Sequence, residues 1–182
     1  EAAAKFTTTN TELEVVTTVE HSKVVYTDGA YVVVAKHYVT YIGETGYESL
    51  QEAFDAAEVE GTTIELSYNE GDAPISMNAS LYGKNVTIKG TATVDWNTNG
   101  NYWLFVGRGG EGNATLTFDN AKLTSVSNNG GIHVSGREKG TDNKYDGTLI
   151  IKNSDIQLTE FINRNDVTIE NSTVTTTLLT SH

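Results

Sequence analysis

Short β-type triplets recur through the second part of the chain, and each of the later ones is followed by the same kind of bend. Two residues after each later triplet stands Gly90, Asn120, Asn153 or Asn171. Gly and Asn tolerate left-handed backbone better than other residues, so these four positions predict one repeated turn. The triplets are Ile64-Glu65-Leu66, Val86-Thr87-Ile88, Leu116-Thr117-Phe118, Leu149-Ile150-Ile151 and Val167-Thr168-Ile169.

Two more apolar runs follow each bend and predict a second and a third strand. The second strand begins near Val94, Leu123, Ile156 and Val174, and the third lies at 103–106, 132–134 and 161–162. Successive triplets are 18 to 33 residues apart. The residues beyond the length of a regular repeat are inserted at one corner, at 107–114 and 135–148. Three strands and a fixed bend in each repeat predict that the chain winds into a coil. Neighbouring coils must stack to bury their inward side chains, and stacking would bring the three Asn residues into an amide ladder.

The chain before the coils has a different character. Residues 6–42 are rich in Thr, Val and Tyr, and Asp28-Gly29 stands between two alternating runs, which predicts a hairpin in a small antiparallel unit. Residues 1–5 equal one unit of a rigid helical spacer and are set aside as linker. We therefore expect a small antiparallel β segment over 6–42 and a coil domain over 43–182.

One amphipathic helix is predicted at about residues 50–60. Ser49 and Glu52 form a capping box, in which a hydroxyl and a carboxylate satisfy unpaired backbone N–H groups. Leu50, Ala53, Phe54 and Ala57 then share one face, and Gly61 provides a left-handed stop. We expect this helix to cover the open first coil.

Charge and composition exclude several classes of function. The net charge is −12, and residues 1–72 carry −11 of it with 14 acidic and 3 basic residues, so a sequence-independent grip on nucleic acid or anionic membrane is excluded. There is no cysteine for a disulfide or a thiolate zinc site. The four His residues show no metal spacing, and alternation points His133 outward. We expect no cofactor, no metal and no membrane insertion.

The repeat resembles the right-handed parallel β-helix of the pectin-lyase-like superfamily. The matching stretches are 116–124, 130–136 and 167–175, and the helix followed by Gly61-Thr62-Thr63-Ile64 is similar to the opening of β-helical modules in large bacterial surface proteins. The resemblance implies a mainly β fold: a parallel β-helix of about five coils, capped at its N-terminal end by the short helix and preceded by the antiparallel unit. Nothing comparable to that helix follows Leu179, so we expect the natural chain to continue.

The same resemblance implies an extracellular, cell-surface location and a non-catalytic structural or adhesive role. Partners would be a host glycan or a host surface protein, together with neighbouring modules of the same chain. The alternative is a fragment of a polysaccharide lyase or hydrolase that acts on pectin-like polymers. The carboxylates Asp95, Asp119, Asp155 and Asp166 fall at different places within their coils, which does not favour the paired carboxylates that such cleavage needs. A purely structural spacer is the third reading.

A binding site, if present, is expected at the corner formed by residues 107–114 and 135–148. Aromatic faces beside bonding groups suit sugar stacking or a protein contact. For Trp96 and Trp103 the alternative is a place in the core, which we favour. The candidate ligand-binding residues are Arg108, Arg137, Tyr145, Trp96 and Tyr102.

Overall fold

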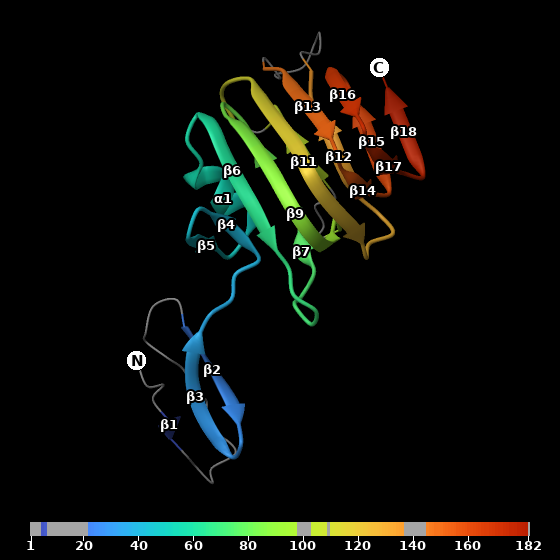
Figure 1. Ribbon diagram of the computed structural model, residues 1–182. Helices are drawn as coiled ribbons and strands as arrows, with labels where there is room; N and C mark the ends of the chain where they lie inside the picture. The colour runs from blue at the N-terminus through green and yellow to red at the C-terminus, as the bar shows by residue number, and fades with distance from the viewer. Residues whose placement is uncertain (1–4, 7–21, 98–102, 109, 137–144, 182) are drawn as a thin grey trace. The chain divides into compact units, whose positions relative to one another are not determined.

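The structure is a computed structural model, and it describes residues 5–6, 22–97, 103–108, 110–136 and 145–181 (Figure 1). The chain divides into two compact units, residues 1–37 and 38–182. It is mainly β, with parallel sheets and one α-helix among the described residues. The division lies earlier than the one expected after residue 42, because strand β4 (Thr40–Ile42) pairs with strand β6 (Glu60–Ser67) of the second unit.

The first unit is a small antiparallel sheet with strand order β1-β3-β2. Its strands are β1 (Lys5–Phe6), β2 (Ser22–Thr27) and β3 (Ala30–Ala35). Asp28 and Gly29 join β2 to β3 with φ angles of 48° and 75°. Two positive φ values in a two-residue loop fit the right-handed twist of the flanking strands, and the predicted hairpin is confirmed.

The larger sheet of the second unit contains the predicted triplets. Its main path runs β16-β13-β11-β9-β6-β4-β5, parallel from β16 to β6 and antiparallel at β4 and β5. Three short strands extend it beyond the bends, and they pair in parallel with β9 or β11 or with each other. The remaining strands are β5 (Thr45–Tyr47), β7 (Ile75–Ser76), β9 (Asn85–Asp95), β11 (Ala114–Ser125), β13 (Gly147–Lys152), β14 (Asp155–Gln157), β16 (Asp166–Glu170) and β17 (Thr173–Thr175).

The second sheet is parallel throughout, with strand order β18-β15-β12-β10-β8. It contains the predicted third strands, which are confirmed. Its strands are β8 (Ala79–Leu81), β10 (Trp103–Val106), β12 (Gly131–Val134), β15 (Glu160–Asn163) and β18 (Leu178–Ser181).

The register of the larger sheet follows the predicted repeat except in its first layer. Val86, Leu116, Leu149 and Val167 are consecutive partners, as predicted. Ile64, however, pairs with Ile88, so placing it beside Val86 was wrong by two residues. In the observed register Leu66 lies opposite Gly90, and a Cβ at Gly90 would collide with the Leu66 carbonyl oxygen. The glycine therefore provides the room that this pairing needs.

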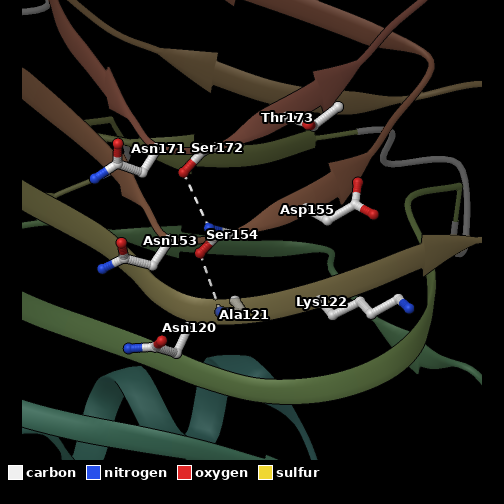
Figure 2. Close-up of a pocket in the computed structure, with 9 residues that line it drawn as sticks. All are labelled: Asn120, Ala121, Lys122, Asn153, Ser154, Asp155, Asn171, Ser172 and Thr173. Carbon is white, nitrogen blue, oxygen red and sulfur yellow. Dashed lines mark hydrogen bonds between the residues drawn. The ribbon is translucent and has the colours of Figure 1, made fainter.

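The four predicted bend residues are confirmed. Asn120, Asn153 and Asn171 have φ angles of 56°, 51° and 47°, and Gly90 has 103°. Figure 2 shows the three Asn residues one above another on successive strands. They do not bond to one another as an amide ladder, because the Asn120 and Asn153 side-chain amides donate to Asp119 Oδ1 at 2.9 and 3.3 Å.

Serine hydroxyls connect the layers at this bend instead. Ser154 Oγ accepts from the Ala121 N–H, and Ser172 Oγ accepts from the Ser154 N–H, both at 3.0 Å (Figure 2). Each hydroxyl also donates within its own strand, Ser154 to the Lys152 carbonyl at 2.7 Å and Ser172 to the Glu170 carbonyl at 2.6 Å. The bend is therefore fixed both along the chain and between layers.

We expect Ser154→Ala to lower the free energy of unfolding by about 1–3 kcal/mol, because the buried Ala121 N–H would lose its acceptor. Urea unfolding measures the change. Ser172→Ala is the matched control, since Ser172 makes the same bonds in a less buried position, and we expect a smaller loss there. Equal losses in the two variants would contradict the role of burial.

Helix α1 (Leu50–Ala56) begins as predicted and ends earlier. Ser49 Oγ accepts from the Glu52 N–H at 3.2 Å, while the Glu52 carboxylate accepts from the Glu48 N–H at 2.9 Å. Ala57 is extended with ψ 144°, so the expected helical end at residue 60 is wrong. Gly61 does have positive φ, 82°, but it lies within β6. In Figure 1 the helix lies at the β6 end of the stack, where its buried face joins the core.

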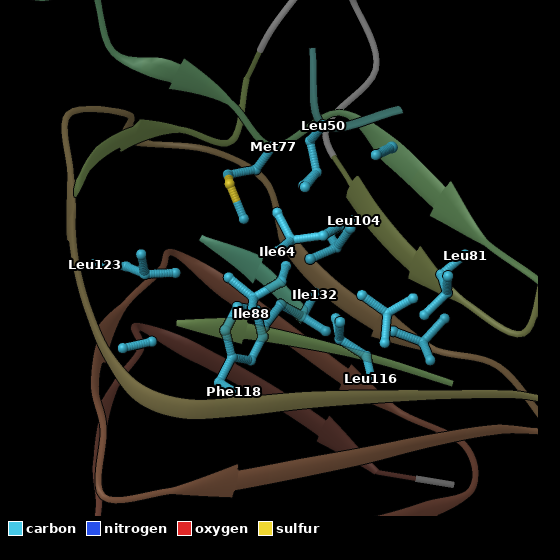
Figure 3. Close-up of a cluster of buried hydrophobic side chains, with 14 of the residues drawn as sticks. Leu50, Ile64, Met77, Leu81, Ile88, Leu104, Leu116, Phe118, Leu123 and Ile132 are labelled. Atoms are coloured by element: carbon cyan, nitrogen blue, oxygen red, sulfur yellow. The ribbon is translucent and has the colours of Figure 1, made fainter. Parts of the chain in front are cut away.

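The core lies between the two sheets of the second unit. Leu104 and Val106 of one sheet and Leu116 and Phe118 of the other are fully buried (Figure 3). Alternation along each strand produces this arrangement, since every second residue points inward. At the opposite end of the stack from α1, the inward positions Ile169 and Leu179 are 47% and 64% exposed.

A row of charged residues of alternating sign crosses the outer face of the larger sheet. Glu65 is the register partner of Lys89, and Lys152 is the partner of both Asp119 and Glu170. Lys89 Nζ lies 3.4 Å from Glu65 Oε2, and Lys152 Nζ lies 3.2 Å from Asp119 Oδ2. Both ion pairs are exposed to solvent, and exposed pairs contribute little to stability. We call these five residues the charge row.

The pKa of Asp119 lies below its ordinary value of 3.8, because the Asn153 amide and the Lys152 ammonium hydrogen-bond to its charged form. A lowered folded-state pKa stabilises the fold above pH 3.8, and that contribution is lost as the pH falls through the folded-state pKa. We therefore expect Asp119→Asn to flatten the fall of Tm below pH 3.8. Thermal melts in that acid range test this, with Lys152→Met expected to weaken the same dependence. An unchanged acid slope in Asp119→Asn would contradict the assignment.

Candidate functional site

The structure brings together the described parts of the predicted corner. The Ala114 N–H donates to the Asp146 carbonyl, and the Asp146 N–H donates to Asn113 Oδ1, both at 3.0 Å. The Gly147 N–H donates to the Ser135 carbonyl at 2.7 Å. A Cβ at Gly147 would collide with the Val106 carbonyl oxygen, so this close approach requires glycine. The two insertions therefore meet beside the end of β10.

Of the five predicted ligand-binding residues, two lie at this corner, one is buried in the core and two are outside the described residues. Arg108 is exposed, and its guanidinium carbon lies 4.8 Å from the centroid of the Phe105 ring. Tyr145 is half-buried in the same corner. Trp96 is fully buried, and its Nε1 donates to the Gln157 carbonyl at 2.9 Å, so it has no ring face for a ligand. Arg137 and Tyr102 lie outside the described residues.

A cluster of rings lies on the outer face of the second sheet, next to this corner. Trp103 and Phe105 alternate along β10 with the buried Leu104 and Val106, so they point away from the core. His133 is the register partner of Phe105 on β12. The His133 ring centroid lies 5.3 Å from that of Phe105 and 5.9 Å from that of Trp103. We call Trp103, Phe105, Arg108 and His133 the aromatic face.

Two sequence-based predictions fail at this face. Trp103 was expected in the core, but it is only half-buried and points outward. His133 does point outward as predicted, yet it is 6% exposed rather than a free surface residue, because the rings of Trp103 and Phe105 cover it. A Cβ at Gly131, the register partner of Trp103, would collide with the Glu160 carbonyl oxygen, so the close approach of β12 and β15 requires glycine. The run Trp103-Leu104-Phe105-Val106, apolar on both faces, was the available signal.

The aromatic face combines ring surfaces with hydrogen-bond donors. The rings present apolar faces, and the Arg108 guanidinium is an exposed cation that stacks on one of them. Such a surface suits a ligand with apolar faces and polar edges. Among the described residues there is no group of three or more His, Asp or Glu side chains that could hold a metal ion.

A second candidate site is the hollow along the Asn bend, with a volume of about 700 Å³. It is open to solvent and polar, and no aromatic residue lines it. Its residues come from three layers, and the serine hydroxyls that line it are already hydrogen-bonded within the bend. The lining residues are Asn120, Ala121, Lys122, Asn153, Ser154, Asp155, Asn171, Ser172 and Thr173 (Figure 2).

Searches of known proteins add no assignment to these sites. Within the described residues, α1 is much too short to span a membrane, and no other helix is present. No protein-family model, curated protein or solved structure matches this chain.

Proposed function

We propose that residues 38–182 form a right-handed parallel β-helix that serves as a non-catalytic adhesive module of a bacterial cell-surface protein. Parallel pairing of corresponding strands in two sheets supports the β-helix, as do the four bend residues with positive φ. The bacterial and surface assignments rest on the resemblance of the helix and first coil to such modules.

In this proposal, the module recognises a host glycan through the aromatic face. The observation that carries it is the outward pair Trp103 and Phe105 with the Arg108 guanidinium stacked 4.8 Å above the Phe105 centroid. Sugar rings present C–H groups to an aromatic face and hydroxyls to the donors beside it. The bend hollow offers polar groups without such a stacking surface.

A glycan array with the full chain tests the proposal, and titration of a bound glycan then measures affinity. We expect Trp103→Ala and Phe105→Ala each to weaken binding by about tenfold or more, if a sugar gains as much from one ring as a nucleic-acid base does, which is roughly 1–3 kcal/mol. Tyr26→Ala is the matched control, because Tyr26 is an aromatic residue 62% exposed in the first unit.

Unchanged binding in Trp103→Ala would move the site away from the aromatic face. An array that stays blank for the wild-type chain would overturn the adhesive role and favour a structural spacer. Release of reducing or unsaturated ends from pectin-like polymers would favour the polysaccharide-degrading alternative.

A further inference from the structure

A cavity of about 290 Å³ lies between the end of α1 and strand β8. Phe54 and Leu81, which also belong to the core, are among its lining residues. Lys84 Nζ donates to the Phe54 and Asp55 carbonyl oxygens, both at 2.7 Å, and so fixes the last turn of the helix beside the cavity. The remaining lining residues are Asp55, Ser80 and Tyr82.

Polar atoms in this cavity are available to a ligand. Gln51 is committed to the fold, since its amide donates to Asp55 Oδ1 at 2.9 Å and accepts from the Ser80 N–H at 2.7 Å. The Ser80 and Tyr82 hydroxyls make no hydrogen bond within the described part of the chain. Asp55 retains its second carboxylate oxygen, and Lys84 retains its third N–H. A pocket lined by apolar residues and a few polar groups is typical of small-molecule sites.

The cavity lies next to the aromatic face in the strand register. Ser80 lines the cavity and is the partner of Phe105, which is in turn the partner of His133. Two strand spacings of about 4.8 Å separate Ser80 from His133, so one ligand that fills both regions extends over roughly 10 Å. A single sugar ring is too short for this, whereas a linear oligosaccharide lying across the strands is long enough.

The charges favour an uncharged ligand. The cavity holds the Asp55 carboxylate, and the Lys84 ammonium is already shared between two helix carbonyls. A ligand carboxylate in the cavity would meet the Asp55 charge at close range, and the exposed Arg108 cation does not line the cavity but belongs to the aromatic face. A neutral sugar needs only the hydroxyl, carboxylate and N–H groups present.

We infer that the ligand is a neutral linear oligosaccharide whose terminal sugar occupies the α1–β8 cavity while the following sugars contact the aromatic face. This inference rests on the proposed glycan-binding function. It adds the length and charge of the ligand and a second binding region.

Titration calorimetry of the full chain with neutral gluco-, galacto- and manno-oligosaccharides of one to four units tests the inference. We expect affinity to rise about tenfold or more from one to three units. Ser80→Val, which removes the hydroxyl and fills the cavity, should weaken trisaccharide binding by about tenfold or more. Thr180→Val is the matched control, because Thr180 is in the same register row on the opposite edge strand. Tyr82→Phe removes a single oxygen and provides a second test if Ser80→Val does not fold.

The possible outcomes test the cavity assignment, the charge of the ligand and the proposed function separately. Trisaccharide binding that is lost in Trp103→Ala but unchanged in both Ser80→Val and Tyr82→Phe would overturn the cavity assignment and leave the proposed function standing. Binding of oligogalacturonates without binding of the neutral series would overturn the charge assignment. No binding to either series or on the array would overturn the proposed function and this inference together.

Discussion

We expect replacement of Gly90 with Ala to lower the free energy of unfolding of the second unit by roughly 2–5 kcal/mol. The backbone at Gly90 has φ 103°, and left-handed backbone costs about 1–2 kcal/mol for a residue with a Cβ. The added methyl group would also collide with the Leu66 carbonyl oxygen, and overpacking costs about 1–3 kcal/mol more. Urea unfolding followed by tryptophan fluorescence measures the change, since Trp96 and Trp103 both lie in the second unit.

Gly71→Ala is the matched control for this prediction. Gly71 has a similar φ of 95°, but nothing lies within 4 Å of its ideal Cβ position. We therefore expect only the backbone cost of about 1–2 kcal/mol there. If both variants lost the same free energy, the Leu66 contact would have no part in fixing the first-layer register.

Trp96→Ala is expected to cost about 3–5 kcal/mol, because removal of a fully buried indole leaves a large cavity in the core. The Gln157 carbonyl would also lose its bond from Nε1, a contact between residues 61 positions apart in the chain. Urea unfolding measures this loss through the fluorescence of the remaining Trp103.

Trp103→Ala is the comparison. Its urea unfolding is followed by circular dichroism instead of fluorescence. Its side chain is half-buried on the outer face, so we expect a loss of about 1 kcal/mol, the usual size for a substitution outside the core. A large loss of stability in Trp96→Ala and a loss of glycan binding in Trp103→Ala would then show that the two tryptophans have different roles. A stable Trp96→Ala variant would contradict the core position of the indole.

Features that depend on one or two neighbouring residues were predictable from the sequence. The hairpin follows from the readiness of Asp28 and Gly29 to take positive φ, and the bends at Asn120, Asn153 and Asn171 follow from the same property. The inward residues Leu104 and Val106 follow from alternation alone. The corner was predictable because the inserted residues fall at the same place in two repeats, between the third strand and the next triplet.

Features decided by distant residues were not predictable in the same way. The first-layer register depends on the space above Leu66 at Gly90, and the end of α1 lies beside Lys84, about thirty positions along the chain. The aromatic face depends on the pairing of β10 with β12, which brings His133 beside Trp103 and Phe105 and which alternation within one strand cannot indicate. The α1–β8 cavity joins a helix to a strand through packing, so no local motif marks it.

The charge row constrains how such a chain can change in length during evolution. Its members alternate in sign from Glu65 to Glu170 along the stack. Removal of the strand that carries Lys152 would bring the Asp119 and Glu170 carboxylates into neighbouring register positions, because Lys152 is the register partner of both.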